Sequence, residues 1–318
     1  MTFRRALRLF FGLIGFVLGV ATAAALYLAR LMISPARQGT WATPEDIGLD
    51  FEEVQFPARD GVRLAGWFIA AREDSDPSGA TIVLVHGWRW SRLGYAAEDL
   101  FANVTGSSQV DLLRLVKALH NCGYHVLTFD LRNHGQSAAA RPVTFGQSEA
   151  KDLLGAITYL DGRDDVDNGR IGVVGFSMGA NAALFALPQT DDVKALVAVQ
   201  PMTPAVFSQR LASDFLGIFG GVVRIMAELI YRIFGGPRIT GILPAFAASS
   251  AGDAPVLFIQ GTGDNWGSID DVSHMAESTP RSQELLFVNS THRFGGYQYL
   301  IDNPGVACAF FDQHLSRK

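Results

Sequence analysis

The 318-residue sequence predicts an α/β protein in which helices flank a mostly parallel central sheet. Short apolar runs rich in Val, Ile and Leu alternate with longer segments of helical periodicity, an order typical of parallel strands joined by right-handed helical crossovers. One such run meets the following helix pattern at a sharp turn, within the sequence GRIGVVGFSMGANAALFAL of residues 169–187. Hydrophobic residues make up 48% and charged residues 18% of the chain, which favours one large globular domain with an apolar appendage.

The appendage comes first. Residues 9–29 carry no charge and are long enough to cross a hydrocarbon core of about 30 Å as a helix. We expect a retained single-pass membrane anchor over residues 1–35, because the apolar run exceeds that of a cleaved signal peptide, which is the alternative. More arginines precede the run than follow it, a bias that predicts a cytoplasmic N-terminus and an extracytoplasmic main domain.

Residues 36–50 form a predicted linker, and the main domain is expected over residues 51–200 and 251–318. It opens with a predicted hairpin of strands over residues 51–56 and 62–70, joined by a turn. The later strands are predicted at residues 82–85, 124–129, 171–174, 193–199, 255–260 and 284–288. The helices are predicted at residues 108–121, 145–160, 178–187, 266–277 and 294–314.

Residues 201–250 interrupt this alternation and predict an inserted helical cap. In its longest helical stretch, residues 215–234, Arg224, Glu228 and Arg232 recur every four residues on one face, and apolar side chains occupy the others. Two interpretations remain open: a lid packed over the sheet, or a lid whose apolar side also contacts lipid.

Charge and cysteine content narrow the range of partners. The net charge is −5 and the chain has no cluster of lysine or arginine, so we expect no nucleic-acid partner. Its two cysteines, Cys122 and Cys308, lie in mostly apolar helical segments, and we interpret them as small buried hydrophobic residues. A disulfide between them remains open, because a sequence does not give their separation in space. Neither cysteine has a partner at metal-ligand spacing, so no metal site is predicted.

The sharp turn carries the strongest chemical signal. The motif GFSMG at residues 175–179 fits a nucleophile elbow, in which a tight strand-to-helix bend raises a serine hydroxyl above the sheet edge. Because a serine is a poor nucleophile without a base, and the base needs a carboxylate to orient it, Ser177 requires two partners. Asp264 and His292 each follow a predicted strand at its carboxyl end, where functional side chains of a parallel sheet gather. Ser177, Asp264 and His292 are therefore the predicted nucleophile, acid and base.

Acyl transfer also needs backbone donors aimed at the oxyanion of the tetrahedral intermediate. Met178 follows the predicted nucleophile at a helix N-terminus, and Trp88 follows His86 and Gly87 in the loop after a buried strand. The N–H groups of Trp88 and Met178 are the predicted oxyanion hole. We interpret His86 as a brace for its loop.

Taken together, these segments resemble the α/β-hydrolase superfamily, in particular its bacterial membrane-anchored esterase and lysophospholipase-like members. The resemblance rests on HGW at residues 86–88, DLRNHGQS at residues 130–137, the GFSMG motif, GTGD at residues 261–264 and His292. It implies an α/β-hydrolase fold and a Ser177, Asp264 and His292 triad. The sequence departs from the family at Thr291, where glycine often precedes the histidine, and in the long connection of residues 88–108.

We therefore expect a serine hydrolase that cleaves carboxylic ester or thioester bonds of lipidic acyl substrates through an acyl-enzyme on Ser177. The lipidic substrate is inferred from the anchor and the cap, since the triad itself is equally suited to a peptidase or amidase. A catalytically silent, membrane-tethered binding module is the alternative from another class. The predicted chemistry requires no cofactor, and the sequence leaves the oligomeric state open.

Overall fold

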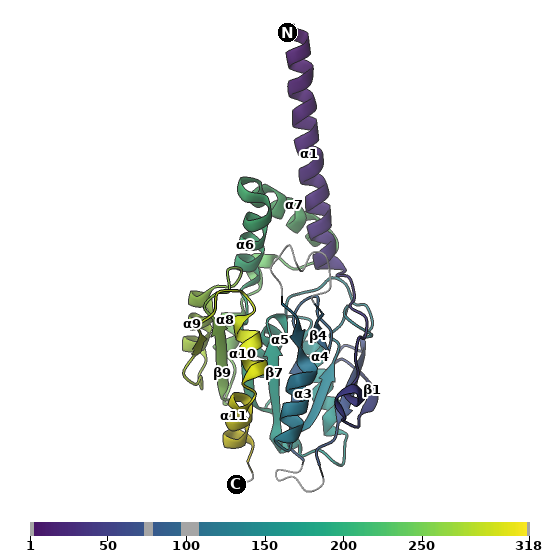
Figure 1. Ribbon diagram of the computed structural model, residues 1–318, viewed down its shortest axis with the longest axis vertical. Helices are drawn as coiled ribbons and strands as arrows, with labels where there is room; N and C mark the ends of the chain where they lie inside the picture. Colours follow the sequence, from purple (N-terminus) through teal and green to yellow (C-terminus); the bar gives the residue numbers. More distant parts are fainter. Residues whose placement is uncertain (1–2, 73–78, 97–107, 317–318) are drawn as a thin grey trace.

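The computed structural model describes residues 3–72, 79–96 and 108–316. An eight-stranded sheet in the order β1-β2-β6-β3-β7-β8-β9-β10 forms the centre of the domain (Figure 1). Its strands are β1 Glu52–Pro57, β2 Arg63–Ile69, β3 Thr81–Val85, β6 His125–Phe129, β7 Ile171–Phe176, β8 Val193–Val199, β9 Val256–Gly261 and β10 Leu286–Val288. β2 pairs antiparallel with β1 and β6, and the pairs from β6 to β10 are parallel. The predicted α/β-hydrolase fold with a mostly parallel sheet is confirmed.

Helices cover both faces of this sheet, and each face holds its own apolar core. One face is covered by α3 Leu112–Asn121, α10 Gly295–Asp302 and α11 Gly305–Leu315. The other is covered by α4 Ala150–Asp161, α5 Met178–Ala186, α8 Pro244–Ala248 and α9 Ile269–Ser278. Because β3 and β7 are buried along their whole length, their continuous apolar sequences agree with a position between two helical layers. A small antiparallel pair, β4 Gly94–Tyr95 and β5 Val110–Asp111, flanks residues 97–107, so part of the long connection lies outside the described residues.

Two predicted helices are interrupted in the structure. The helix expected at residues 294–314 is divided into α10 and α11 at Asn303 and Pro304, because proline lacks an N–H and cannot continue a helix. The cap helix expected at residues 215–234 is divided as well, into α6 Pro204–Leu216 and α7 Gly220–Ile233. Gly217 has a φ of 52° at this break. A Cβ on Gly220 would lie 2.4 Å from the Ala212 carbonyl oxygen, so the glycine allows α7 to fold back closely on α6.

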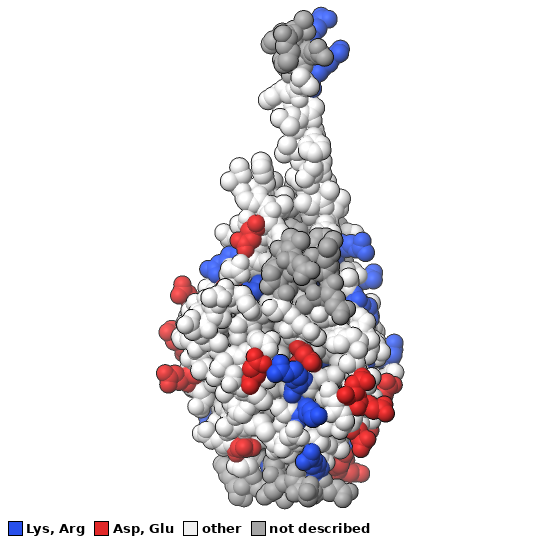
Figure 2. Space-filling model, viewed as in Figure 1, with Lys and Arg blue, Asp and Glu red and all other residues white. Residues whose placement is uncertain are grey.

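The N-terminal helix α1 Phe3–Ile33 projects from the domain beside α6 and α7 (Figure 1). Its segment Leu7–Ile33 is long and apolar enough to span a membrane, by length and composition. On the face shown in Figure 2, the projecting part is almost free of charged residues below its tip, whereas lysine, arginine, aspartate and glutamate gather on the domain. The C-terminal half of α1 packs on α7 through small residues, with Ala25, Ala29, Val223 and Ala227 buried between the two helices.

The two cysteines form a disulfide, the possibility that the sequence left open beside our interpretation of them as small buried hydrophobic residues. Cys122 follows the end of α3 and Cys308 lies in α11, and their Cα atoms are 6.3 Å apart. The sequence could not predict this proximity, because the two residues are 186 positions apart and meet only when α3 and α11 pack on the same face of the sheet.

Candidate active site

Ser177 occupies a strained turn between β7 and α5. Its φ of 52° and ψ of −113° lie outside the conformations that a serine ordinarily adopts. The turn is held against its neighbours, since the Ser177 N–H donates to the Val199 carbonyl at 2.9 Å. A Cβ on Gly179 would lie 2.2 Å from the Val85 carbonyl oxygen, so only glycine allows α5 to begin this close to the end of β3. The local geometry is that of a nucleophile elbow.

The two predicted oxyanion donors flank this turn. Met178 is the first residue of α5, so its N–H has no partner within the helix. Trp88 lies in the loop after β3, and a Cβ on the neighbouring Gly87 would be 3.4 Å from the Phe176 carbonyl oxygen, which places that loop beside the elbow. Among the described residues, neither the Trp88 nor the Met178 N–H donates a hydrogen bond to a loop or turn acceptor.

Asp264 follows β9 in a turn that surrounds its carboxylate with donors. Oδ1 accepts hydrogen bonds from the backbone N–H groups of Trp266 at 3.2 Å and Gly267 at 3.0 Å, and Oδ2 accepts one from Gln200 Nε2 at 3.0 Å. Burial raises the pKa of Asp264 above its usual value, and these three donors act in the opposite direction. The structure thus holds Asp264 in one orientation beside the pocket that Ser177 lines.

Gln200 is a site residue that sequence reasoning missed. It directly follows β8 with a φ of 45° and is only 1% exposed. Besides Asp264, its Nε2 donates to the Arg293 carbonyl at 2.8 Å, and its Oε1 accepts from the Gly296 N–H at 2.6 Å. Its position at the carboxyl end of a parallel strand is the sequence signal that points to it.

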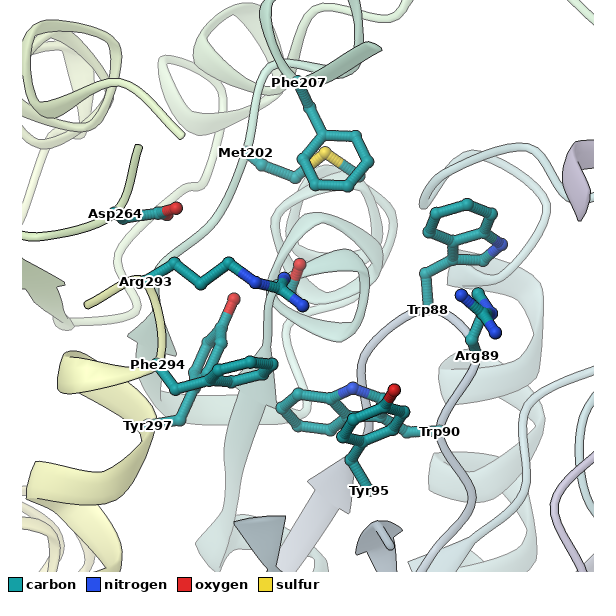
Figure 3. A pocket seen from close by; sticks show the side chains of 11 residues that line it. Trp88, Arg89, Trp90, Tyr95, Met202, Phe207, Asp264, Arg293, Phe294 and Tyr297 are labelled. Atoms are coloured by element: carbon teal, nitrogen blue, oxygen red, sulfur yellow. The ribbon is translucent and has the colours of Figure 1, made fainter. Parts of the chain in front are cut away.

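The predicted base is not brought to the other two residues. The His292 side chain is exposed, and its Nδ1 accepts a hydrogen bond from the Phe294 N–H at 3.1 Å. Among the described residues, none of its interactions joins it to Ser177 or Asp264. Arg293 enters the pocket instead, and Figure 3 shows its guanidinium between Asp264 and the loop that carries Trp88. The guanidinium stacks on Trp266 at 3.9 Å and on Phe294 at 4.1 Å from the ring centroids.

Two other histidines, His86 and His134, lie near the loop that carries Trp88, and both ring nitrogens of each have a hydrogen-bond partner. His86 Nε2 accepts from the Leu131 N–H at 3.0 Å while Nδ1 lies 2.8 Å from the Gly87 carbonyl oxygen. His134 Nε2 accepts from the Arg89 N–H at 3.2 Å while Nδ1 lies 2.8 Å from the Arg132 carbonyl oxygen. Each ring is therefore a neutral imidazole that donates from Nδ1. Burial lowers the pKa of His86 to about 4 and that of His134 to about 3, so both act as braces for the loop.

The site opens into a small cavity of about 70 Å³, whose walls combine aromatic and polar side chains (Figure 3). A hydrogen bond joins the side chains of Ser177 and Tyr297, and burial raises the pKa of the Tyr297 hydroxyl. The cavity is lined by Trp88, Arg89, Trp90, Tyr95, Ser177, Met202, Phe207, Asp264, Arg293, Phe294 and Tyr297. The structure therefore brings Ser177, Asp264 and Trp88 to one cavity and leaves the His292 side chain outside its lining.

Known proteins share this architecture. The sequence profile described as "Alpha/beta hydrolase family" matches residues 82–299. The alpha/beta hydrolase domain-containing protein WAV2 of Arabidopsis thaliana is 26% identical over 262 residues, which cover 80% of this chain and 77% of WAV2. The esterase Pf2001 of Pyrococcus furiosus superposes with a TM-score of 0.68 at 24% identity, covering 90% of this chain and 99% of the esterase. An acylaminoacyl peptidase of Pyrococcus horikoshii superposes with a TM-score of 0.60 at 18% identity, covering 85% of this chain and 42% of the peptidase.

The two solved structures share the fold of this chain. The profile match begins in β3 and ends in α10, so it includes the elbow, the Asp264 turn and the His292 segment. From its sequence and its architecture, this chain belongs to the alpha/beta hydrolase family.

Proposed function

We propose that this protein is a membrane-anchored serine hydrolase that cleaves carboxylic ester or thioester bonds of acyl substrates. The observation that carries the proposal is the strained turn at Ser177, which presents its hydroxyl to the same cavity as the hydrogen-bonded carboxylate of Asp264. A serine is held at a positive φ only where surrounding structure imposes it, and such strain is typical of functional sites.

In this mechanism, Ser177 Oγ attacks the substrate carbonyl carbon while His292 removes the hydroxyl proton. The carbonyl oxygen becomes an oxyanion, which the N–H groups of Trp88 and Met178 stabilise. His292 returns the proton to the departing alcohol or thiol, and an acyl-enzyme remains on Ser177. Water then attacks the acyl carbon with His292 as base, which releases the acid and restores the serine.

The His292 assignment requires the turn after β10 to rearrange. His292 and Thr291 are exposed and lie in neither a helix nor a strand, so few contacts oppose a change in this segment. The backbone of this segment already lies beside the Asp264 turn, because a Cβ on Gly263 would be 2.5 Å from the backbone nitrogen of His292. We propose that His292 turns inward as Arg293 leaves the cavity. The two buried histidines described above have both ring nitrogens engaged, which leaves His292 as the base that this proposal uses.

Replacing the base tests this step. We expect His292→Ala to lower kcat at least about a hundredfold, the lower end of general-base contributions, and added imidazole to restore part of the rate. His274 lies exposed in α9 and outside the lining of the catalytic cavity, and His274→Ala serves as the matched control with wild-type kinetics. A His292→Ala enzyme with wild-type kcat would remove His292 from the mechanism.

The anchored, extracytoplasmic location is part of the proposal. The disulfide between Cys122 and Cys308 supports it, because structural disulfides persist in oxidising compartments. Alkylation of the denatured protein, taken from membranes without reductant, should leave both cysteines unmodified. Modification of both would place the domain in a reducing compartment.

A panel of substrates tests whether the enzyme prefers esters to amides. We expect acyl esters and thioesters of graded chain length to be hydrolysed and peptide amides to be hydrolysed poorly, with Ser177→Ala inactive on all. Faster turnover of the amides would favour the peptidase or amidase reading. Folded protein without turnover of any substrate would favour a silent binding module.

A further inference from the structure

The membrane helix contributes to the wall of a cavity that adjoins the active site. This second cavity, of about 260 Å³, lies between α1, α6 and the catalytic cavity. Its lining is mainly apolar: α1 contributes Ala24 and Leu31, and α6 contributes Leu211 and Phe215. Trp88, Arg89, Tyr95 and Arg293 also line the catalytic cavity, so the two spaces share a boundary. An apolar ligand in the second cavity would therefore point one end toward Ser177.

The depth of this cavity relative to a bilayer follows from the charges on α1. Residues 9–29 are uncharged, and Arg8 and Arg30 flank them. At about 1.5 Å of rise per residue this segment matches a hydrocarbon core of about 30 Å. Ala24 and Leu31 thus lie around the C-terminal boundary of the core, at the level where the ester bonds of membrane lipids meet the headgroups.

The cap surface next to α1 is apolar and exposed. In α7, Ile225, Leu229 and Ile233 are 52%, 55% and 81% exposed, on the side away from the residues that pack against α1. Further exposed apolar side chains at the turn between α6 and α7 are Phe215, Ile218, Phe219 and Val222. A soluble domain rarely exposes so many large apolar side chains, and a membrane beside α1 would cover those of α7.

We propose that the second cavity binds the acyl chain of a membrane lipid, which enters laterally from the bilayer with α1 as one wall of its path. The proposal deepens, and rests on, the assignment of Ser177 as the nucleophile. It commits to a bilayer lipid as the occupant, because the cavity, the exposed cap surface and the membrane boundary of α1 lie at one level. The anchor is then a substrate-binding element as well as a tether.

Covalent trapping tests where the acyl chain of the substrate lies. The full-length protein in vesicles is treated with a fluorophosphonate that carries a long alkyl chain and a terminal photoreactive group. After illumination, we expect crosslinked peptides from α1 around Ala24 and Leu31 and from α6 around Leu211 and Phe215. A Ser177 adduct with crosslinks only outside α1 would overturn the acyl path while leaving the nucleophile intact. The absence of any Ser177 adduct would instead overturn the proposed function.

A matched pair of variants tests whether α1 forms a wall of the second cavity. Ala24 lines the cavity, whereas the adjacent Ala23 is exposed on another face of α1. We expect Ala24→Phe to lower the ratio of kcat/KM for a dodecanoyl ester to that for a butanoyl ester by about tenfold or more, since filling the cavity displaces several methylenes. Ala23→Phe should keep the wild-type ratio. An unchanged ratio in Ala24→Phe, or equal losses in both variants, would contradict the proposal.

Discussion

Gln200 provides the sharpest prediction about how the site is held together. Its amide makes three hydrogen bonds, to the Asp264 carboxylate, the Arg293 carbonyl and the Gly296 N–H. Gln200→Leu keeps a similar volume and removes all three. The lost bond to the carboxylate costs about 1.5–3 kcal/mol, and each backbone group left unsatisfied costs about 1–3 kcal/mol. With partial relaxation, we expect a loss of about 4 kcal/mol in the free energy of unfolding.

The same change should reduce catalysis through Asp264. The Gln200 hydrogen bond lowers the pKa of Asp264, so its loss raises that pKa further. Because the mechanism requires the ionised carboxylate, the acidic limb of the kcat/KM profile should move to higher pH. We expect kcat/KM at neutral pH to fall about tenfold or more, with KM for a short ester nearly unchanged. Thermal unfolding and ester kinetics across pH measure both effects.

The matched control is another buried glutamine. Gln260 in β9 is 1% exposed, its Nε2 donates to the Gly261 carbonyl, and its Oε1 has no partner among the described residues. Gln260→Leu should therefore be nearly neutral in stability and activity. Wild-type kinetics and pH profile in folded Gln200→Leu, or equal losses in both variants, would refute the positioning role of Gln200.

Three further predictions concern the scaffold. The double variant Cys122→Ser and Cys308→Ser should lose up to about 5 kcal/mol, because the disulfide closes a loop of 186 residues; reduced and oxidised melting curves that coincide would contradict this. Gly179→Ala should cost about 1–3 kcal/mol and reduce esterase activity, because its Cβ would overlap a carbonyl oxygen of β3, whereas Gly221→Ala, with open space around it, should not. His134 is neutral when folded and has a pKa lowered to about 3, so the unfolded state binds more protons below about pH 6.5 and stability falls as the pH drops. His134→Gln should flatten this loss, measured by chemical denaturation between pH 7 and pH 5, and a loss as steep as that of the wild type would refute it.

Local features of the fold were predictable because they depend on short-range sequence. β8 lies at residues 193–199 as predicted, since an apolar run such as that of residues 195–199 is typical of a buried parallel strand. The elbow was predictable for the same reason, because Gly175, Ser177 and Gly179 satisfy steric demands within five residues.

Features that depend on distant contacts were not predictable. The pairing of Cys122 with Cys308 exists only through the packing of helices far apart in sequence. The apolar sides of α7 were interpretable either as core or as lipid-facing surface, and in the structure Ala227 is buried against α1 whereas Leu229 is exposed. Arg293 lies in the cavity where His292 was predicted. This difference depends on side-chain direction within one turn, which residue types alone do not specify.

The central claim is that Ser177 is the nucleophile of an acyl-transfer site, and covalent labelling tests it most directly. The purified full-length protein is treated with a simple fluorophosphonate, and the modified peptide is identified by mass spectrometry. We predict one adduct on Ser177 that appears together with the loss of esterase activity, and no adduct in Ser177→Ala. An unlabelled wild-type protein, or equal labelling of Ser177→Ala, would contradict the account.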